Sequence, residues 1–170
     1  MTARILGVDL GSRRVGLAVA DAAIGMARPL ATLNRGASLD ADVAAIGRVC
    51  RDQDVVELVV GLPVEARGSE GEMAAAARAW AAAMGERLGL PVTLHDERLS
   101  SFAAEQRLGR MPRGRSGGAP TRKQRNAHRA KVDREAASII LQDELDARGG
   151  ARRAAPGASP APGPAPEEER

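Results

Sequence analysis

A carboxylate inside an apolar strand is the feature that most constrains this chain. Asp9 follows the run Ile5-Leu6-Gly7-Val8 and precedes Leu10. A strand that is apolar on both faces is covered on both sides of its sheet. An ionised carboxylate there is costly unless it is paired or binds a metal ion. The sequence therefore predicts a sheet covered on both faces, with a carboxylate near its centre that needs a partner.

The pattern of apolar residues predicts alternating strands and helices. Strands are expected at residues 5–10, 15–21, 29–33, 55–60 and 91–94, and helices at 40–52, 72–88, 100–108 and 126–147. The glycine-containing turn at 11–14 predicts a β-hairpin, and helices between the later strands predict parallel strands with right-handed crossings. The result is an α/β fold with a mixed five-stranded sheet, antiparallel at its start and parallel later, flanked by helices. That strand plan resembles the ribonuclease H-like fold.

Composition limits the class of protein. The chain has 170 residues, of which 44% are hydrophobic, and residues 1–148 are expected to form one domain. Residues 149–170 contain five Pro, four Gly and six Ala, and we expect a disordered tail because they bury too little apolar surface. No apolar run is long enough to span a membrane, and no signal region opens the chain. With Cys50 as its single cysteine, the chain is expected to be cytoplasmic, without a disulfide or a Cys-based zinc site.

Positive charge is concentrated in one segment. From Arg98 to Lys131 the chain has ten Lys and Arg but one acid, Glu105, whereas the net charge of the whole chain is +3. A basic block of this kind suits a polyanion such as nucleic acid. A solvated loop in an arginine-rich protein explains the charge equally well, so charge alone does not decide. Because Trp80 and Phe102 are the only aromatic residues, base stacking is not expected to dominate nucleic-acid contacts.

Two further acidic residues interrupt apolar patterns. Glu97 lies at the carboxyl end of an expected strand, where ligand sites of open α/β sheets gather. Asp133 shares a helix face with small or apolar residues three, four and seven positions later. Each acid has a structural explanation: turn hydrogen bonds for Asp9, an ion pair with Arg98 for Glu97, and the helix dipole for Asp133. Together the three favour a divalent-cation site, with Mg²⁺ or Mn²⁺ as hard cations that prefer oxygen ligands.

The chemistry open to such a site is phosphodiester hydrolysis. Two carboxylate-bound ions can activate a water molecule and stabilise the leaving oxygen, without a histidine cluster or a serine nucleophile. Gly7 and Gly11 flank Asp9 and are expected to leave the space that a phosphate needs. His95 and His128 are isolated in the sequence, and each is expected to be a surface or core-edge residue rather than a catalyst.

Four motifs carry a resemblance to a known family. They are Ile5–Asp21, Val59–Pro63 with Gly68–Gly71, Asp96–Ser101, and Val132–Asp133 leading to Gln142. In this order and spacing they resemble the YqgF (RuvX) family, whose members are described as pre-16S rRNA nucleases and as Holliday junction resolvases. The likeness spans about Arg4 to Leu145. The chain departs from the family at Ser100, where Thr is more common, and at Glu65 and Arg67, where Asn and Asp are common, which leaves the substrate contacts of that loop open.

The resemblance implies a ribonuclease H-like fold and a divalent-metal-dependent nuclease. It maps the catalytic, metal-binding acids onto Asp9, Glu97 and Asp133, the three that the burial pattern also selects. One-metal and two-metal chemistry both stay open. Two substrates are implied: the 5′ end of precursor 16S rRNA, favoured as the family's commoner assignment, and branched DNA. The residues expected to contact nucleic acid are Arg13, Arg14, Arg98, Arg110, Arg113, Arg115, Arg122, Lys123, Arg125 and Lys131.

Two alternatives come from other classes of protein. Asp9-Leu10-Gly11-Ser12 also resembles the first phosphate loop of actin-like ATPases, which suggests a nucleotide-binding switch. A non-catalytic RNA-binding protein that keeps the acids as structural remnants is the other alternative. The expected partners are nucleic acid, either precursor rRNA or branched DNA, together with ribosomal particles, and no membrane. We expect a monomer or a weak homodimer.

Overall fold

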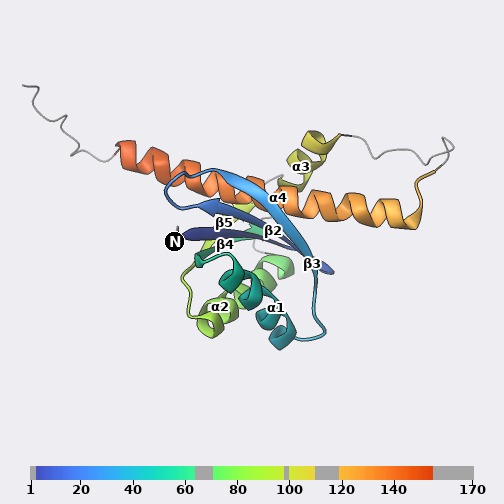
Figure 1. Cartoon of the computed structure of the whole chain (residues 1–170), viewed down its shortest axis with the longest axis horizontal. Helices are drawn as coiled ribbons and strands as arrows, with labels where there is room; N and C mark the ends of the chain where they lie inside the picture. Colours follow the sequence, from blue (N-terminus) through green and yellow to red (C-terminus); the bar gives the residue numbers. More distant parts are fainter. Residues whose placement is uncertain (1–2, 64–70, 98–99, 110–118, 155–170) are drawn as a thin grey trace, which may run out of the picture.

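The computed structural model describes residues 3–63, 71–97, 100–109 and 119–154. These residues form five strands and four helices (Figure 1). In chain order they are β1 (Arg4–Leu10), β2 (Arg14–Asp21), β3 (Ala27–Asn34), α1 (Leu39–Asp52), β4 (Val55–Pro63), α2 (Glu72–Leu88), β5 (Val92–Glu97), α3 (Ser100–Leu108) and α4 (Arg122–Ala154).

The strands form one mixed sheet in the order β3-β2-β1-β4-β5. The pairs β1–β2 and β2–β3 are antiparallel, and the pairs β1–β4 and β4–β5 are parallel. The predicted α/β fold, with an antiparallel start and parallel later strands, is confirmed. Because β1, β4 and β5 run in one direction, their carboxyl ends meet at the same edge of the sheet, where ligand sites of such sheets gather.

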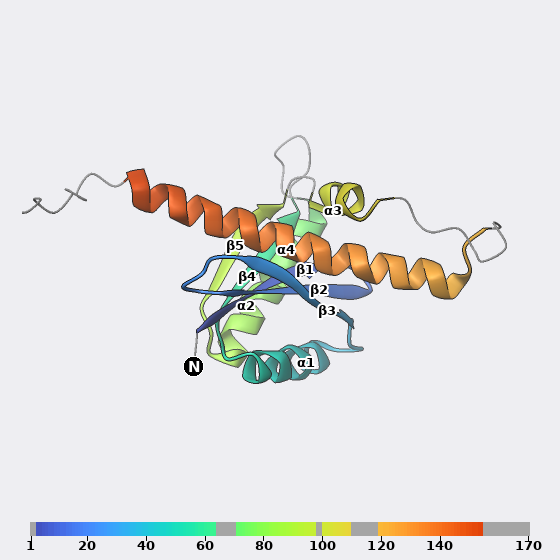
Figure 2. The same cartoon turned by 45° about the horizontal axis from the view of Figure 1, so that its top comes forward.

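Helices cover both faces of the sheet, as the doubly apolar strands predicted. The helices α1 and α2 lie on one face, and the long helix α4 crosses the other and contacts all five strands (Figures 1 and 2). Alternate residues of β1 and β2 face the α1–α2 side and form the larger core with Ile46, Trp80 and Met84. Cys50 packs in the same core, on the buried stripe of α1.

The face under α4 is packed through small residues. Ile5 on β1 contacts a cluster that includes Ala137, Ile140 and Leu141 of α4. A Cβ added to Gly7 would lie 2.7 Å from the Leu141 Cβ, so the absence of a side chain lets α4 lie close to the sheet. Gly7 was expected to leave space for a phosphate, and this was wrong, because α4 fills that space. Gly11, by contrast, lines the hollow described below.

Several strands extend beyond the ranges predicted from the sequence. β4 continues through Gly61 to Pro63 because β5 pairs with it as far as Glu97. Met73 at the start of α2 is 58% exposed and does not contribute to the core, although it is apolar. Alanines lie on both faces of that helix, so its apolar pattern did not define the buried face. The burial is carried instead by Ala74, Ala77, Trp80, Ala81 and Met84.

The helix α4 also runs further than predicted, from Arg122 to Ala154 instead of 126–147. Its carboxyl-terminal part is anchored by Arg148, which donates to Glu144 one turn earlier at 2.8 Å and to Glu57 of β4 at 2.9 Å. The helix therefore includes residues 149–154, which the sequence prediction assigned to a disordered tail. Residues 155–170 lie outside the described part of the chain. None of the described helices is long and apolar enough to cross a membrane.

Candidate functional site

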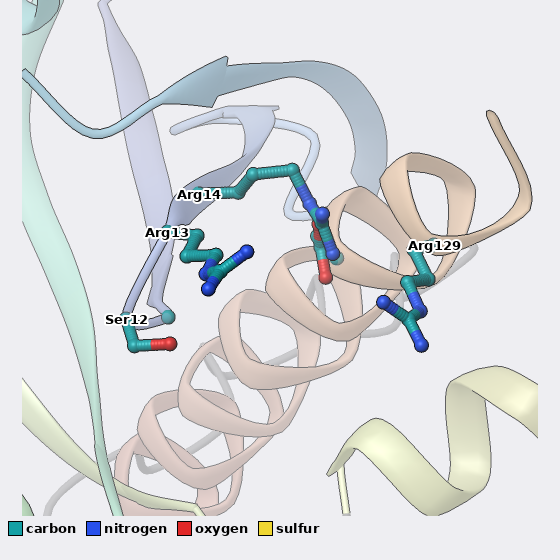
Figure 3. Close-up of a pocket in the computed structure, with 6 residues that line it drawn as sticks. Ser12, Arg13, Arg14 and Arg129 are labelled. Atoms are coloured by element: carbon teal, nitrogen blue, oxygen red, sulfur yellow. The ribbon is translucent and has the colours of Figure 1, made fainter. Parts of the chain in front are cut away.

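A hollow lies between the β1–β2 turn and helix α4. It has a volume of about 600 Å³ and is lined by Gly11, Ser12, Arg13 and Arg14 from the turn and by Arg129 and Asp133 from α4. Figure 3 shows the side chains of Arg13 and Arg14 extending from the turn, with Arg129 on the facing helix. Three guanidinium groups and one carboxylate therefore surround a volume that can hold a phosphate group.

Asp133 is held in this hollow by an ion pair. The Nε–H of Arg14 donates to Asp133 Oδ2, and the exposed fractions of the two side chains are 26% and 22%. The next turns of α4 bury Ala136, Ala137 and Ile140, so Asp133 lies on the packed side of the helix, as predicted. An ion pair this exposed is worth about 0–1 kcal/mol. A cation that binds the carboxylate more strongly can therefore displace Arg14 at small cost.

Asp9 faces the same side of the sheet as α4. It alternates along β1 with Ile5 and Gly7, which pack against that helix, and it is partly buried. Its cross-strand partner is Gly16 on β2, where an added Cβ would collide with the carbonyl oxygen of Asp133. This close approach puts Asp133 one strand away from Asp9. Since Asp9 does not line the hollow, the two aspartates occupy neighbouring positions without sharing one cavity.

Glu97 is the last residue of β5, where it pairs with Pro63 at the end of β4. It therefore lies at the sheet edge where β1 also ends, two strands from Asp9. Its neighbour Asp96 is exposed. The Glu97 side chain and the whole of Arg98 lie outside the described residues. The structure places the backbone of Glu97 at the expected edge and does not test its carboxylate.

The β1–β2 turn is fixed by Arg35, which follows β3. The backbone N–H of Arg35 donates to Arg13 O at 2.9 Å, and its Nη1 donates to Gly11 O at 3.3 Å. The turn also closes on itself through Gly11 N–H, which donates to Arg14 O at 2.9 Å. The backbone that carries Arg13 and Arg14 is thus held from two directions, and the Arg14 side chain is held in addition by its ion pair with Asp133.

Arg35 is itself held by a buried aspartate. Its Nε donates to Asp42 Oδ2 at 2.8 Å, and Asp42 also accepts from the Gly36 N–H at 2.7 Å and from Trp80 Nε1 at 3.1 Å. Burial opposes ionisation of Asp42, whose side chain is 4% exposed, but these three donors outweigh burial and lower its pKa below the ordinary value of 3.8. Asp42 is therefore a structural anion beneath the turn.

The basic residues expected to bind nucleic acid fall into three groups. Arg13 and Arg14 line the hollow. Arg122, Lys123, Arg125 and Lys131 are exposed on the amino-terminal half of α4, which extends beyond the sheet (Figure 2). Arg98, Arg110, Arg113 and Arg115 lie outside the described residues. The described members thus surround the hollow or continue from it along α4.

Other titratable side chains are engaged in structural contacts. His95 Nδ1 lies 2.9 Å from Glu144 Oε2, at the contact between β5 and α4, which agrees with a core-edge histidine. Arg148 also binds Glu144, and it lowers the pKa of Glu57 by hydrogen bonding. Burial raises the pKa of the Cys50 thiol to about 11, so this cysteine is unreactive near neutral pH. None of these groups lines the hollow.

The donor chemistry of the site fits a hard divalent cation. Of the three expected ligands, Asp9 and Asp133 have described side chains, and both offer carboxylate oxygens, which Mg²⁺ and Mn²⁺ prefer. Among the described side chains, no three His, Cys, Asp or Glu residues lie close enough together to hold a metal ion. A complete set would need Glu97 in addition to the two aspartates.

Three residues that shape this site were not predicted from the sequence. Arg129 lies four residues before Asp133, and that spacing puts both on one helix face. Asp42 lies four residues before the buried Ile46, so its position on the packed stripe of α1 was a usable signal. Arg35 carried no such signal, because its contacts with Asp42 and Gly11 arise only from the folded arrangement of β3, α1 and the turn.

The chain resembles known proteins over most of its length. The model of the family described as "RuvX: Holliday junction resolvase" matches residues 3–147. The chain belongs to the RuvX family. It is 48% identical over 145 residues to a protein of Anaeromyxobacter dehalogenans (strain 2CP-1 / ATCC BAA-258) named "Putative pre-16S rRNA nuclease", covering 85% of this chain and 98% of that one. A Chloroflexus aurantiacus (strain ATCC 29366 / DSM 635 / J-10-fl) protein of the same name is 41% identical over 144 residues, covering 85% of this chain and 87% of that one.

A solved structure shares the fold of this RuvX family member. It is the Thermus thermophilus RuvC in complex with a Holliday junction substrate, with a TM-score of 0.50 and 18% sequence identity. The match covers 87% of this chain and 96% of the RuvC chain. The predicted family and the ribonuclease H-like fold are both confirmed.

Proposed function

We propose that this RuvX family member is a divalent-metal-dependent nuclease that hydrolyses phosphodiester bonds during 5′-end processing of precursor 16S rRNA. The observation that carries the proposal is the hollow in which Asp133 faces the guanidinium groups of Arg13, Arg14 and Arg129. The hollow lies next to the end of β1 that carries Asp9. A carboxylate next to several guanidinium groups suits a negatively charged phosphate that must be bound next to a metal ion. The names of the relatives support precursor rRNA as the substrate.

We assign Asp9, Glu97 and Asp133 as the catalytic residues and the ligands of Mg²⁺ or Mn²⁺. A divalent cation bound by carboxylates supplies an activated water and stabilises the leaving oxygen. Arg13 and Arg129 have no ion-pair partner among the described residues and would bind the phosphate. Arg14 has a double role: it holds the Asp133 carboxylate in place, and it is free to contact the phosphate once that carboxylate has another cation.

The remaining basic residues extend the proposed interface. Lys123, Arg125 and Lys131 are exposed on the same half of α4 as Arg129 and would contact the flanking backbone of the substrate. Arg98, Arg110, Arg113 and Arg115 stay predictions, because they lie outside the described part of the chain. Ribosomal particles as partners, a cytoplasmic location and a monomeric or weakly dimeric state also stay predictions.

Branched DNA is the second candidate substrate. The description of the matching family is a Holliday junction resolvase, and this favours a DNA junction over an unrelated polyanion. The site itself does not discriminate, because guanidinium contacts to phosphates carry no sequence information and hold either polymer. A non-catalytic RNA-binding protein and an actin-like nucleotide-binding switch are weaker alternatives, and the following assay separates both from a nuclease.

The test is a side-by-side cleavage assay with Mg²⁺ and with Mn²⁺. The substrates are a 5′ fragment of precursor 16S rRNA and a four-way DNA junction, and the proteins are the wild type and Asp133→Asn. We expect metal-dependent cutting of the rRNA fragment that the substitution removes. Preferential cutting of the junction would assign the protein to the second candidate.

A matched control is available on the same helix. Asp143 is exposed on α4, and Asp143→Asn removes the same charge without touching the hollow, so it should cut as the wild type does. If the wild type binds RNA but cuts neither substrate, the nuclease assignment is wrong and RNA binding alone remains. Tight ATP binding without cutting would favour the nucleotide-binding switch.

A further inference from the structure

A second hollow adjoins the first on the outer side of the β1–β2 turn. It has a volume of about 310 Å³ and lies between the edge strand β3 and the amino-terminal part of α4. Arg13, Arg14 and Arg129 line both hollows. Because three side chains are common to both, the two hollows lie side by side with a row of arginines between them.

The second hollow has a strongly positive wall. It adds Arg122 to the three shared arginines, and no Asp or Glu is among the residues that line it. Arg14 pairs with Asp133, but within the described residues Arg13, Arg122 and Arg129 have no carboxylate partner. Cations gathered without counter-charges repel one another, and a bound anion relieves that repulsion. Asn34 and Asn126 also line the hollow, and their amide groups can donate to phosphate oxygens.

The walls of this hollow are fixed before any ligand binds. Thr32 on β3 donates from Oγ1 to the carbonyl oxygen of Ala130 on α4 at 2.6 Å. The start of α4 is capped reciprocally: Gln124 N–H donates to Thr121 Oγ1 at 3.2 Å, and Thr121 N–H donates to Gln124 Oε1 at 2.8 Å. With the turn fixed by Arg35, the backbone segments that carry these arginines are in place before an anion binds, and only the side chains need to adjust.

We propose that the second hollow binds a backbone phosphate of the nucleic acid, neighbouring the phosphate that is cut in the first hollow. Two adjoining basic hollows match the repeated phosphates of a polymer better than the single phosphate cluster of a free nucleotide. No aromatic residue lines either hollow, so the contacts are to the backbone and are independent of base sequence. This inference rests on the proposed function, and it names Arg122, Asn126 and Asn34 as residues that act in the second hollow alone.

The test measures binding of a short, fluorescently labelled single-stranded RNA by anisotropy in EDTA, so that cleavage plays no part. The Kd is followed from roughly 50 to 200 mM salt, where lost phosphate contacts change the slope of log K against log salt. Arg122→Gln should weaken RNA binding and make the slope of log K against log salt shallower by about 0.7, the contribution of one phosphate contact with a single strand. Asn34→Asp places a negative charge in the same hollow and should weaken binding as well.

The matched control is Arg48→Gln. Arg48 is exposed on α1, on the opposite face of the sheet from α4. The Arg48→Gln variant should therefore bind RNA with the wild-type affinity and the wild-type salt dependence. Thermal unfolding of each variant checks that the fold is retained. If Arg122→Gln and Asn34→Asp bind as Arg48→Gln does, the second phosphate position is wrong while the nuclease assignment stands. If the wild type binds no RNA in the first place, the proposed function and this inference both fail.

Discussion

Two Arg–Asp pairs hold the same turn from opposite sides, and they differ in burial. Asp42 is 4% exposed and accepts from Arg35, Gly36 and Trp80, whereas Asp133 is 22% exposed and accepts from Arg14. Asp42 cannot lose Arg35 without leaving a buried carboxylate short of a charged partner, even though the Arg35 side chain is 31% exposed. Asp133, which is partly exposed, can exchange Arg14 for another cation without leaving a buried charge. An Arg–Asp pair therefore supports the fold permanently at Asp42, whereas at Asp133 the carboxylate can exchange its arginine for another cation.

The largest effect is expected from removal of the buried Asp42 charge. Asp42→Asn removes the charge that accepts from Arg35, Gly36 and Trp80, and because the Arg35 side chain is 31% exposed we expect a loss of about 1–3 kcal/mol of unfolding free energy. Urea denaturation measures the loss. Asp40→Asn is the matched control, because Asp40 lies on the same helix, is 77% exposed and pairs with Arg87. The control should change stability by less than about 1 kcal/mol, and equal effects would remove the distinction between the pairs.

The second prediction concerns the exposed pair. Asp133→Asn should change the unfolding free energy by less than about 1 kcal/mol, since the pair with Arg14 is partly exposed. Its cleavage rate should nevertheless fall at least ~100-fold, the upper range for residues that only support a metal ligand. Cleavage kinetics and urea denaturation of the same protein check both parts. If Asp133→Asn loses much stability and still cleaves, Asp133 supports the fold and is not needed for cleavage.

The third prediction follows from the lowered pKa of Asp42. The pKa of Asp42 is lower in the folded than in the unfolded state, so its charge stabilises the fold at pH values above the unfolded pKa. This stabilisation is lost as the pH falls through the folded pKa. The wild type should therefore lose stability below about pH 4. Asp42→Asn, which has no such charge to lose, should show a shallower acid slope in urea titrations. An identical slope in both proteins would show that Asp42 does not titrate with unfolding.

The smallest effect is expected at Arg14. Because Arg14 occupies the Asp133 carboxylate, Arg14→Gln should free that carboxylate and tighten Mn²⁺ binding by up to about 5-fold, the equivalent of ~1 kcal/mol. Calorimetric titration without nucleic acid measures this change. Arg48→Gln again serves as the control for loss of one positive charge. Weaker Mn²⁺ binding in Arg14→Gln would mean that Arg14 positions Asp133 and does not compete with the cation.

Much of this arrangement followed from sequence periodicity. The period of two along β1 placed Asp9 on one face with Gly7, and the helical period placed Asp133 on the packed side of α4. Periodicity describes one element at a time, so it could not show that α4 fills the space at Gly7. Nor could it join Arg35 to Asp42 and Trp80, since that contact spans three elements.

The length of α4 was underestimated for a related reason. The two glycines at 149 and 150 are poor helix formers, and the sequence prediction ended the helix before them. The folded structure offsets that local cost with the contacts of Arg148 to Glu57 and Glu144. Tertiary contacts thus overrode the local preference of the chain.

Whether Asp9 and Asp133 bind a metal ion is measured by a calorimetric Mn²⁺ titration of the wild type, Asp9→Asn, Asp133→Asn and the surface control Asp143→Asn. If Asp9 and Asp133 are ligands, each substitution should weaken Mn²⁺ binding at least ~10-fold, while Asp143→Asn binds as the wild type does. Wild-type Mn²⁺ affinity in Asp133→Asn would contradict the claim, and would leave Asp133 as no more than the partner of Arg14.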